Sequence, residues 1–182
     1  MKQLFLTAFF VLALAGCGSK GDVVIQDGEG NKVEVKDGQT QVTSTDEKGG
    51  TVKTNVEPDG KMTTESSNGD KSSVGVSIPE SEFGVPYYPG STHGASSPIK
   101  TETGAEINFA AMTTTKDDPA TVIKFYESKV TEPKKSSASS DGMVMESVSG
   151  KLADGSEVAI AATKAKDATE TQITLTVRRT KK

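Results

Sequence analysis

Between Val23 and Ser77 the sequence returns to a two-residue turn signal every ten to twelve residues. This repetition constrains the fold more than any other feature of the chain. The signals are Asp27-Gly28, Asp37-Gly38, Gly49-Gly50, Asp59-Gly60 and Asn68-Gly69. Asp-Gly and Asn-Gly pairs readily adopt the positive φ angles of tight hairpin turns. Between the turns apolar and polar residues alternate, as in Val33-Glu34-Val35, and a period of two indicates β-strands.

Two interpretations of this region are open. It is either an antiparallel ribbon or meander whose valines line one face, or a largely disordered, solvated stalk that cannot offset the entropy cost of ordering. The region carries 7 Lys and 13 acidic residues between Ser19 and Glu82, and no aromatic residue occurs between Phe10 and Phe83. A single-layer sheet with so thin an apolar face needs cover from the second domain, another copy or a partner.

The second half of the chain has a different composition and predicts a compact α+β module. Alternation at Ile107, Phe109 and Ala111 predicts a strand within 99–115, after a short hairpin at Gly104. A helix follows, with Pro119 at its first position, and the helical region ends at Pro133. The carboxylate of Asp117 or Asp118 is expected to accept hydrogen bonds from the free backbone N–H groups of its first turn. The apolar stripe Val122, Ile123, Tyr126 and Val130 predicts that this helix covers a sheet.

A polar, Ser-rich loop is expected from Lys134 to Gly142. Three strands are expected after it, over Met143–Leu152, Glu157–Thr163 and Thr171–Arg178. The predicted fold is therefore α+β, with an antiparallel sheet and one covering helix in the order strand, helix, strand, strand, strand. The expected domains are a signal peptide at 1–16, a lipid anchor and short linker at 17–22, a polar β-rich repeat region or stalk at 23–78, a linker and lead-in loop at 79–98, and the α+β module at 99–182.

The first residues have the layout of an export signal. Lys2 is followed by an apolar run from Leu4 to Leu14, which is too short to cross a bilayer. The stretch Leu14-Ala15-Gly16-Cys17 resembles the lipobox of bacterial lipoproteins. That resemblance implies a diacylglyceryl group on the thiol of Cys17, cleavage before it and acylation of the new amine. In the Gram-negative members of that family, Gly18 and Ser19 after the cysteine imply sorting to the outer membrane.

A second resemblance covers residues 83–182. The run Val85-Pro-Tyr-Tyr-Pro-Gly-Ser, followed by Asp117-Asp-Pro-Ala-Thr-Val-Ile-Lys-Phe-Tyr, resembles a module of exported bacterial proteins. In that module a P-x-YPG lead-in precedes a D-x-P-x-x-V-x-x-F-Y helix. The resemblance implies a small α+β domain and implies no activity.

Catalysis, cofactors and metals have little support in the residues. His93 is the only histidine, and a hydrolase would have to combine it with a serine such as Ser91 and with Asp117 or Asp118, without a Gly-x-Ser-x-Gly turn. The lone Cys17 and His93 do not provide a zinc site, and turn chemistry explains the aspartates beside glycines without calcium. The net charge of −4 does not favour nucleic-acid binding. No catalytic, cofactor or metal residues are therefore predicted.

The expected function is that of a membrane-anchored envelope lipoprotein without enzymatic activity. It would act as a structural or interaction module that binds another envelope protein. The membrane would be a second partner, through lipid on Cys17. The alternative is a lipoprotein that binds a small ligand or glycan through the loop from Tyr87 to His93 and the sheet face opposite the helix. Its contact residues would be Tyr87, Tyr88 and His93, because aromatic faces favour such contacts.

Overall fold

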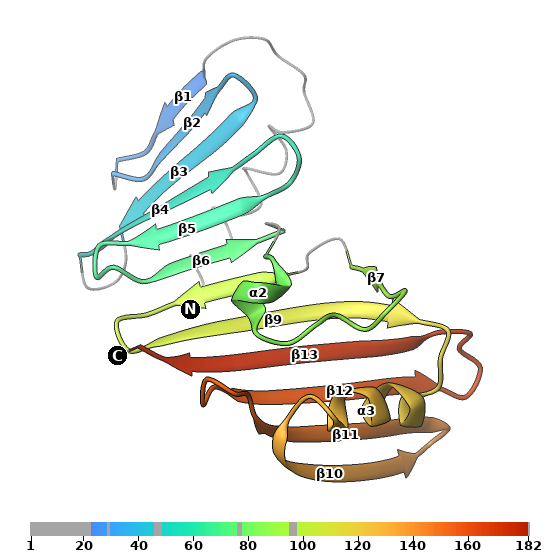
Figure 1. Ribbon diagram of the computed structural model, residues 1–182. Coiled ribbons are helices and arrows are strands. Elements are labelled where there is room, and N and C mark those ends of the chain that lie inside the picture. Colours follow the sequence, from blue (N-terminus) through green and yellow to red (C-terminus); the bar gives the residue numbers. More distant parts are fainter. Residues whose placement is uncertain (1–22, 29, 46–48, 76–77, 95–97, 182) are drawn as a thin grey trace. The chain divides into compact units, whose positions relative to one another are not determined.

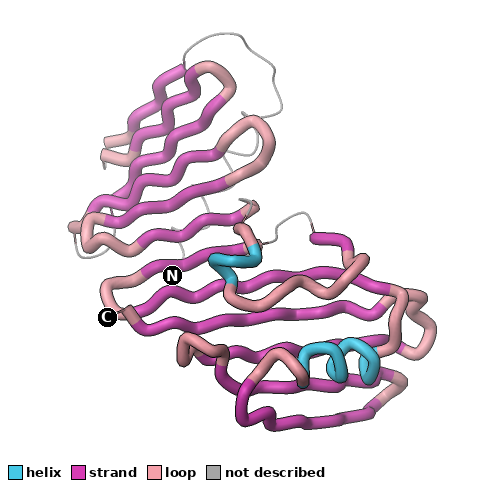
Figure 2. Tube along the Cα trace, in the orientation of Figure 1, coloured by secondary structure: helices cyan, strands magenta, loops and turns pink. Residues whose placement is uncertain are grey.

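The computed structural model describes residues 23–28, 30–45, 49–75, 78–94 and 98–181. The chain divides into two compact units, the first ending at Lys71 and the second beginning at Ser72. Each unit is an antiparallel β-structure (Figures 1 and 2). The predicted anchor residue Cys17 lies outside the described residues.

The first unit is a β-meander. Its strands are β1 (Val23–Gln26), β2 (Lys32–Lys36), β3 (Gln39–Thr45), β4 (Thr51–Val56) and β5 (Met62–Ser66), and each pairs with the next. Asp37 and Gly38 form a two-residue turn with φ of 50° and 80°, the two positive angles that the Asp-Gly pair predicted. For the described residues, the meander interpretation is confirmed and the disordered stalk is wrong.

The valines of the meander, except Val24, share one face of the sheet. The register places Val33 opposite Val42, and Val42 opposite Thr54 on the next strand. Val35, Thr40 and Val56 form a parallel row on the same face, and Thr40 at its centre is buried. The apolar face therefore runs across the strands as the alternation predicted, although Ile25 and Met62 at its margins remain exposed.

The second unit holds the hydrophobic core. Its strands are β7 (Thr92–His93), β8 (Ile99–Glu102), β9 (Glu106–Thr115), β10 (Thr131–Ser140), β11 (Met143–Lys151), β12 (Glu157–Ala165) and β13 (Thr171–Thr180), and a further strand, β6 (Lys71–Val74), spans the boundary between the units. The spatial order is β8-β9-β13-β12-β11-β10, and β7 pairs with β9. One face of this sheet packs against helix α3 (Pro119–Glu127) and against the segment around the one-turn helix α2 (Glu80–Phe83). The buried side chains on that face include Phe109, Val148, Ile160, Ile173, Leu175 and Val177.

Helix α3 forms where the sequence predicted a helix, with two differences. Pro119 is its first residue, and Val122, Ile123 and Tyr126 are buried against the sheet. The helix ends at Glu127, well before Pro133. The predicted aspartate cap is wrong because the Asp118 carboxylate makes no capping hydrogen bond and instead pairs with Lys164 at 3.0 Å.

The predicted loop from Lys134 to Gly142 is wrong, because most of it is strand β10. The residues of β10 are all exposed, so neither face supplies the apolar alternation by which strands are recognised. Pro133 is accommodated because the register with β11 shifts between Thr131 and Lys134, and Glu132 has a φ of 52° in this bulge.

The α+β assignment is also wrong. Among the described residues, 57% lie in strands and 9% in helices, so the fold is essentially all-β. The physical reason is that the residues from Thr131 to Ser140, which were expected to form the end of a helical region and a loop, extend the sheet as β10. The predicted antiparallel strands after residue 142 do form, at Met143–Lys151, Glu157–Ala165 and Thr171–Thr180.

Candidate functional site

The segment that carries Tyr87, Tyr88 and His93 follows α2 and lies against the core of the second unit. Tyr87 is half-buried, and its backbone N–H donates a hydrogen bond to Glu80 Oε1 at 3.0 Å. The Tyr87 ring lies between two neighbours, with its centroid 5.5 Å from that of Phe83 and 4.4 Å from that of His93. Burial raises the pKa of the Tyr87 hydroxyl above its ordinary value.

Tyr88 is buried in the core. It is 7% exposed, and its ring contacts Phe125 and Tyr126 of α3. Its hydroxyl donates a hydrogen bond to Asp117 Oδ2 at 2.6 Å. Burial, together with this bond to the carboxylate, raises the pKa of Tyr88 to about 12. Tyr88 therefore fastens the segment to the residues that precede α3.

His93 is exposed and lies on the short strand β7, opposite Thr113 of β9. Its ring meets that of Tyr87 at 88°, in an edge-to-face arrangement. Of the three predicted contact residues, the structure thus brings Tyr87 and His93 together, while Tyr88 is buried against α3. Ligand contact at these residues stays a prediction.

The predicted ligand-binding alternative also uses the face of the second sheet opposite α3, and the structure gives the residues on that face. The register aligns Ser147, Ala161, Thr174 and Met112 in one row across β11, β12, β13 and β9. The next rows on this open face contain Met145, Thr163, Gln172 and Thr114, and Ser149, Ala159, Thr176 and Ala110. None of these twelve residues is charged, although a quarter of the residues in the chain are charged. The alternation of Thr174 and Thr176 with the core residues of β13 indicates this face in the sequence.

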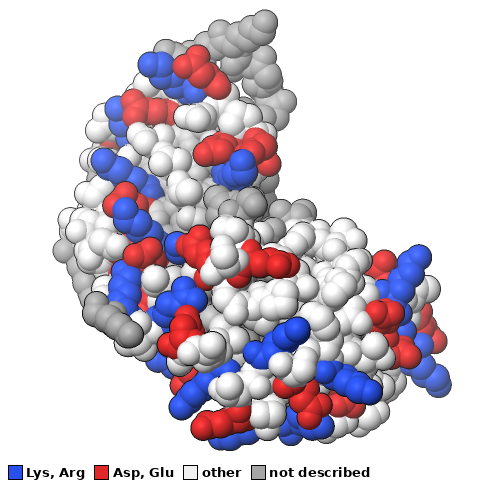
Figure 3. Space-filling view, in the orientation of Figure 1, with Lys and Arg blue, Asp and Glu red and all other residues white. Residues whose placement is uncertain are grey.

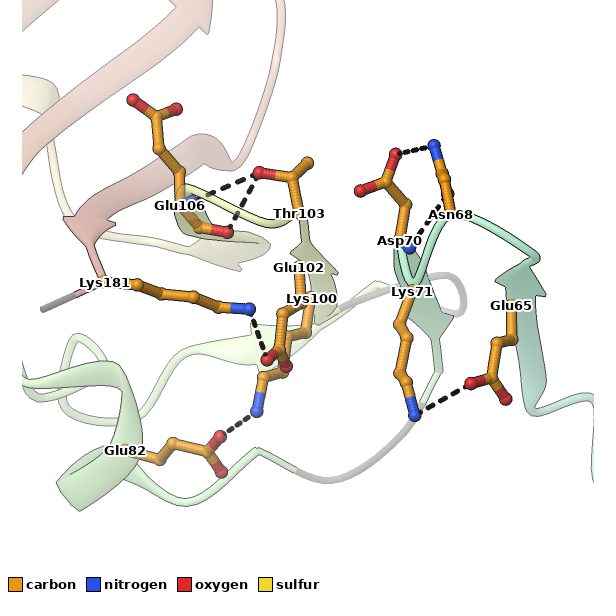
Figure 4. A network of polar contacts seen from close by, with 10 residues as sticks. All are labelled: Glu65, Asn68, Asp70, Lys71, Glu82, Lys100, Glu102, Thr103, Glu106 and Lys181. Atoms are coloured by element: carbon orange, nitrogen blue, oxygen red, sulfur yellow. Dashed lines mark hydrogen bonds and ion pairs between the residues drawn. The ribbon is translucent and has the colours of Figure 1, made fainter.

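Charged side chains gather elsewhere on the second unit. Figure 3 shows basic and acidic side chains interspersed on the side of the second unit that carries α3. Lys100 pairs with Glu82, which connects β8 to α2, and Lys181 pairs with Glu102 at 2.8 Å (Figure 4). In the first unit Lys71 pairs with Glu65 at 3.1 Å (Figure 4). Such exposed pairs contribute little stability individually, about 0–1 kcal/mol, but they fix the geometry of neighbouring elements.

Each unit also has a shallow hollow. One of about 330 Å³ lies at the start of α3, where Pro119, Val144 and Lys164 are among its lining residues. Another of about 440 Å³ lies on the polar face of the meander, lined in part by Glu34, Gln41 and Asn55. In the part of the chain that the structure describes, no three His, Cys, Asp or Glu side chains are grouped as a metal site would need. Neither described helix has the length and apolar character to span a membrane.

The chain matches no family model, no curated protein and no solved structure. Its function is therefore argued from its own residues.

Proposed function

We propose that this protein is a lipid-anchored component of a bacterial cell envelope that acts by binding another protein and not by catalysis. The anchor would be Cys17. The observation that carries this proposal is the sequence Leu14-Ala15-Gly16-Cys17 at the end of a short apolar run, with the single cysteine of the chain at the position that lipoprotein processing requires. Two or three acyl chains on one residue anchor a protein stably, whereas a single chain is only marginal.

The binding role is supported by the open face of the second unit. A sheet face that meets only water usually carries charged side chains, whereas these three rows present Ser, Thr, Ala, Met and one Gln across four strands. Met112 is 48% exposed and Met145 is 40% exposed. Flexible thioethers among small side chains suit a surface that adapts to a partner.

The anchor is tested by fractionating cells that express the full-length chain. Wild-type protein should sediment with membranes, remain there in high salt and be released by detergent. Cys17→Ser should lose metabolic labelling with palmitate, and it should not be processed at this site. The matched control is Ser19→Ala, which should leave labelling unchanged. Equal palmitate labelling of wild type and Cys17→Ser would contradict the proposal.

The second candidate function, binding of a small ligand or glycan, is favoured by the Tyr87–His93 pair. An aromatic ring beside an exposed imidazole offers a stacking face and a hydrogen-bonding group at the same place. Binding to the native state raises the melting temperature by mass action. Chitin-type and cell-wall oligosaccharides should therefore raise the melting temperature of wild type but not of His93→Ala. If no oligosaccharide shifts either protein, this candidate is wrong.

A further inference from the structure

Strand β10 forms an edge of the second sheet. It is the last strand in the order β9-β13-β12-β11-β10, as Figure 1 shows, and in the described part of the chain it pairs only with β11. All ten of its residues, Thr131–Ser140, are exposed. An edge strand of this length presents a row of backbone donors and acceptors that can pair with another strand.

The register identifies which backbone groups face outward. Ser140 pairs with Met143 across the two-residue turn Asp141-Gly142, whose φ angles are 49° and 77°. In such a hairpin the pair that closes the turn is hydrogen-bonded, and hydrogen-bonded pairs then recur at every second residue. Ser140, Ala138 and Ser136 therefore bond to β11. The N–H and C=O groups of Lys135, Ser137 and Ser139 point away from β11.

The two halves of β10 differ in how well they are protected against pairing. Pro133 and the bulge beside it interrupt the first half, and Lys134 and Lys135 add positive charge there. Proline, bulges and lysines are the usual means of blocking edge-to-edge pairing. Residues 136–140 have the sequence Ser-Ser-Ala-Ser-Ser, with no charge and no proline, so the second half is open.

We propose that β10 pairs antiparallel with β10 of a second copy of this chain, around a two-fold axis at Ala138. This proposal goes beyond the proposed function, because it uses the edge of the sheet and not its open face, and the partner is a second copy of the chain. In this register Ser137 faces Ser139 of the other copy, so the outward backbone groups of both strands meet. Lys135, whose Nζ also pairs with Glu127 of its own chain at 3.1 Å, comes opposite the other copy's Asp141, so each basic half meets an acidic residue. Centring the axis on Ser137 would place Lys135 opposite a serine and Asp141 opposite Pro133.

The register is tested by disulfide trapping in the full-length chain. At the axis, two copies of residue 138 form a non-hydrogen-bonded pair with Cα atoms about 4.5 Å apart, and a disulfide spans about 4.4–6.8 Å. Ala138→Cys should therefore be oxidised to a dimer. The matched control is Ser136→Cys, on the same strand and face, because its two copies would be offset by four residues, about 13 Å. The unmodified chain, oxidised in parallel, reports any contribution from Cys17.

Most of the Ala138→Cys chain should become dimeric, whereas Ser136→Cys should remain monomeric. A monomeric Ala138→Cys chain would overturn the proposal. Equal dimerisation of the two variants would also overturn it, because that result indicates random collision without a register. Palmitate labelling of Cys17 is measured separately, so loss of the anchor and loss of the dimer can be told apart.

A second variant tests whether backbone pairing holds the copies together. Ser137→Pro, added to Ala138→Cys, removes an outward N–H that does not bond to β11, so the sheet itself should persist in circular dichroism. The disulfide dimer should be lost, while Ser137→Ala, which keeps the N–H, should retain it. A dimer that forms equally well with proline at position 137 would show that the contact does not use the edge of β10.

Discussion

At the scale of single residues, Tyr88 shows how one hydroxyl connects two distant segments. Its ring is buried beside Tyr126 while its O–H reaches Asp117, 29 residues later in the chain. Asp117 in turn accepts a hydrogen bond at its backbone oxygen from Thr171 Oγ1 at 2.6 Å. Asp117 therefore connects the lead-in segment to β13 as well as to α3.

We predict that Tyr88→Phe lowers the free energy of unfolding by about 1–2 kcal/mol, because a hydrogen bond to a charged acceptor is lost while the ring is retained. Urea unfolding of the second unit measures this change. Tyr87→Phe is the matched control, since the Tyr87 hydroxyl lies 3.4 Å from its acceptor, Ile78 O. A loss for Tyr87→Phe as large as that for Tyr88→Phe would contradict the importance of the Asp117 bond.

The burial of Tyr88, together with the same bond, predicts a loss of stability in alkali. The pKa of Tyr88 rises from 10.0 to about 12 on folding, so between these values the unfolded chain loses this proton while the folded chain retains it. The contribution of Tyr88 to stability is therefore complete below pH 10 and is lost as the pH rises through about 12, by roughly 3 kcal/mol in total. Burial also raises the pKa of Tyr126, which adds to the fall. Urea unfolding between pH 8 and 11.5 should show the decline, and Tyr88→Phe should show a shallower one.

Gly150 is required for a close approach of two segments of the backbone. A Cβ at this position of β11 would lie 2.5 Å from Thr131 O and 3.3 Å from Val130 Cβ. Gly150→Ala should therefore cost about 1–3 kcal/mol, the usual cost of overpacking. Gly104→Ala is the control because nothing lies within 4 Å of the added methyl group. Thermal unfolding should show a lower melting temperature for the first variant only.

At the scale of elements, hairpins were predicted well where two signals coincided. Asp37-Gly38 marked a turn between alternating strands, and the register there is as expected. Asp141-Gly142 is an equally good turn signal. The strand before it is polar on both faces, so the sequence predicts a loop there instead of a hairpin. An edge strand that buries neither face has no apolar alternation to reveal it, although it pairs with β11 through the local turn at Asp141-Gly142.

The valine face of the meander gives a prediction at this scale. Val42 lies between Val33 and Thr54 on the apolar face, whereas its neighbour Gln41 lies on the polar face. Val42→Asp should cost about 1–3 kcal/mol, because it places a charge among apolar side chains. Amide hydrogen exchange of residues 32–56 should accelerate in this variant and change little in Gln41→Asp. Equal exchange in the two variants would mean that the valine face stabilises nothing.

At the scale of the whole molecule, the positions of strands could be predicted from the sequence better than the fold class. Local alternation and turn signals predict where the strands lie. The balance of helix and sheet depends on where α3 ends and on whether the residues after it pair with a neighbouring strand. Tyr87, Tyr88 and His93 could be selected from their types and loop setting. Their division into a surface pair and a buried anchor could not, because it depends on the distant side chains of Asp117 and Phe125.

Anchoring of the chain through Cys17 is the central claim about the whole protein. The most direct test is the intact mass of the protein purified from membranes in detergent. We predict a chain that starts at Cys17 and carries a diacylglyceryl group, with or without a further acyl chain on its amine. A chain that retains residues 1–16, or one that begins at another residue without lipid, would contradict the account.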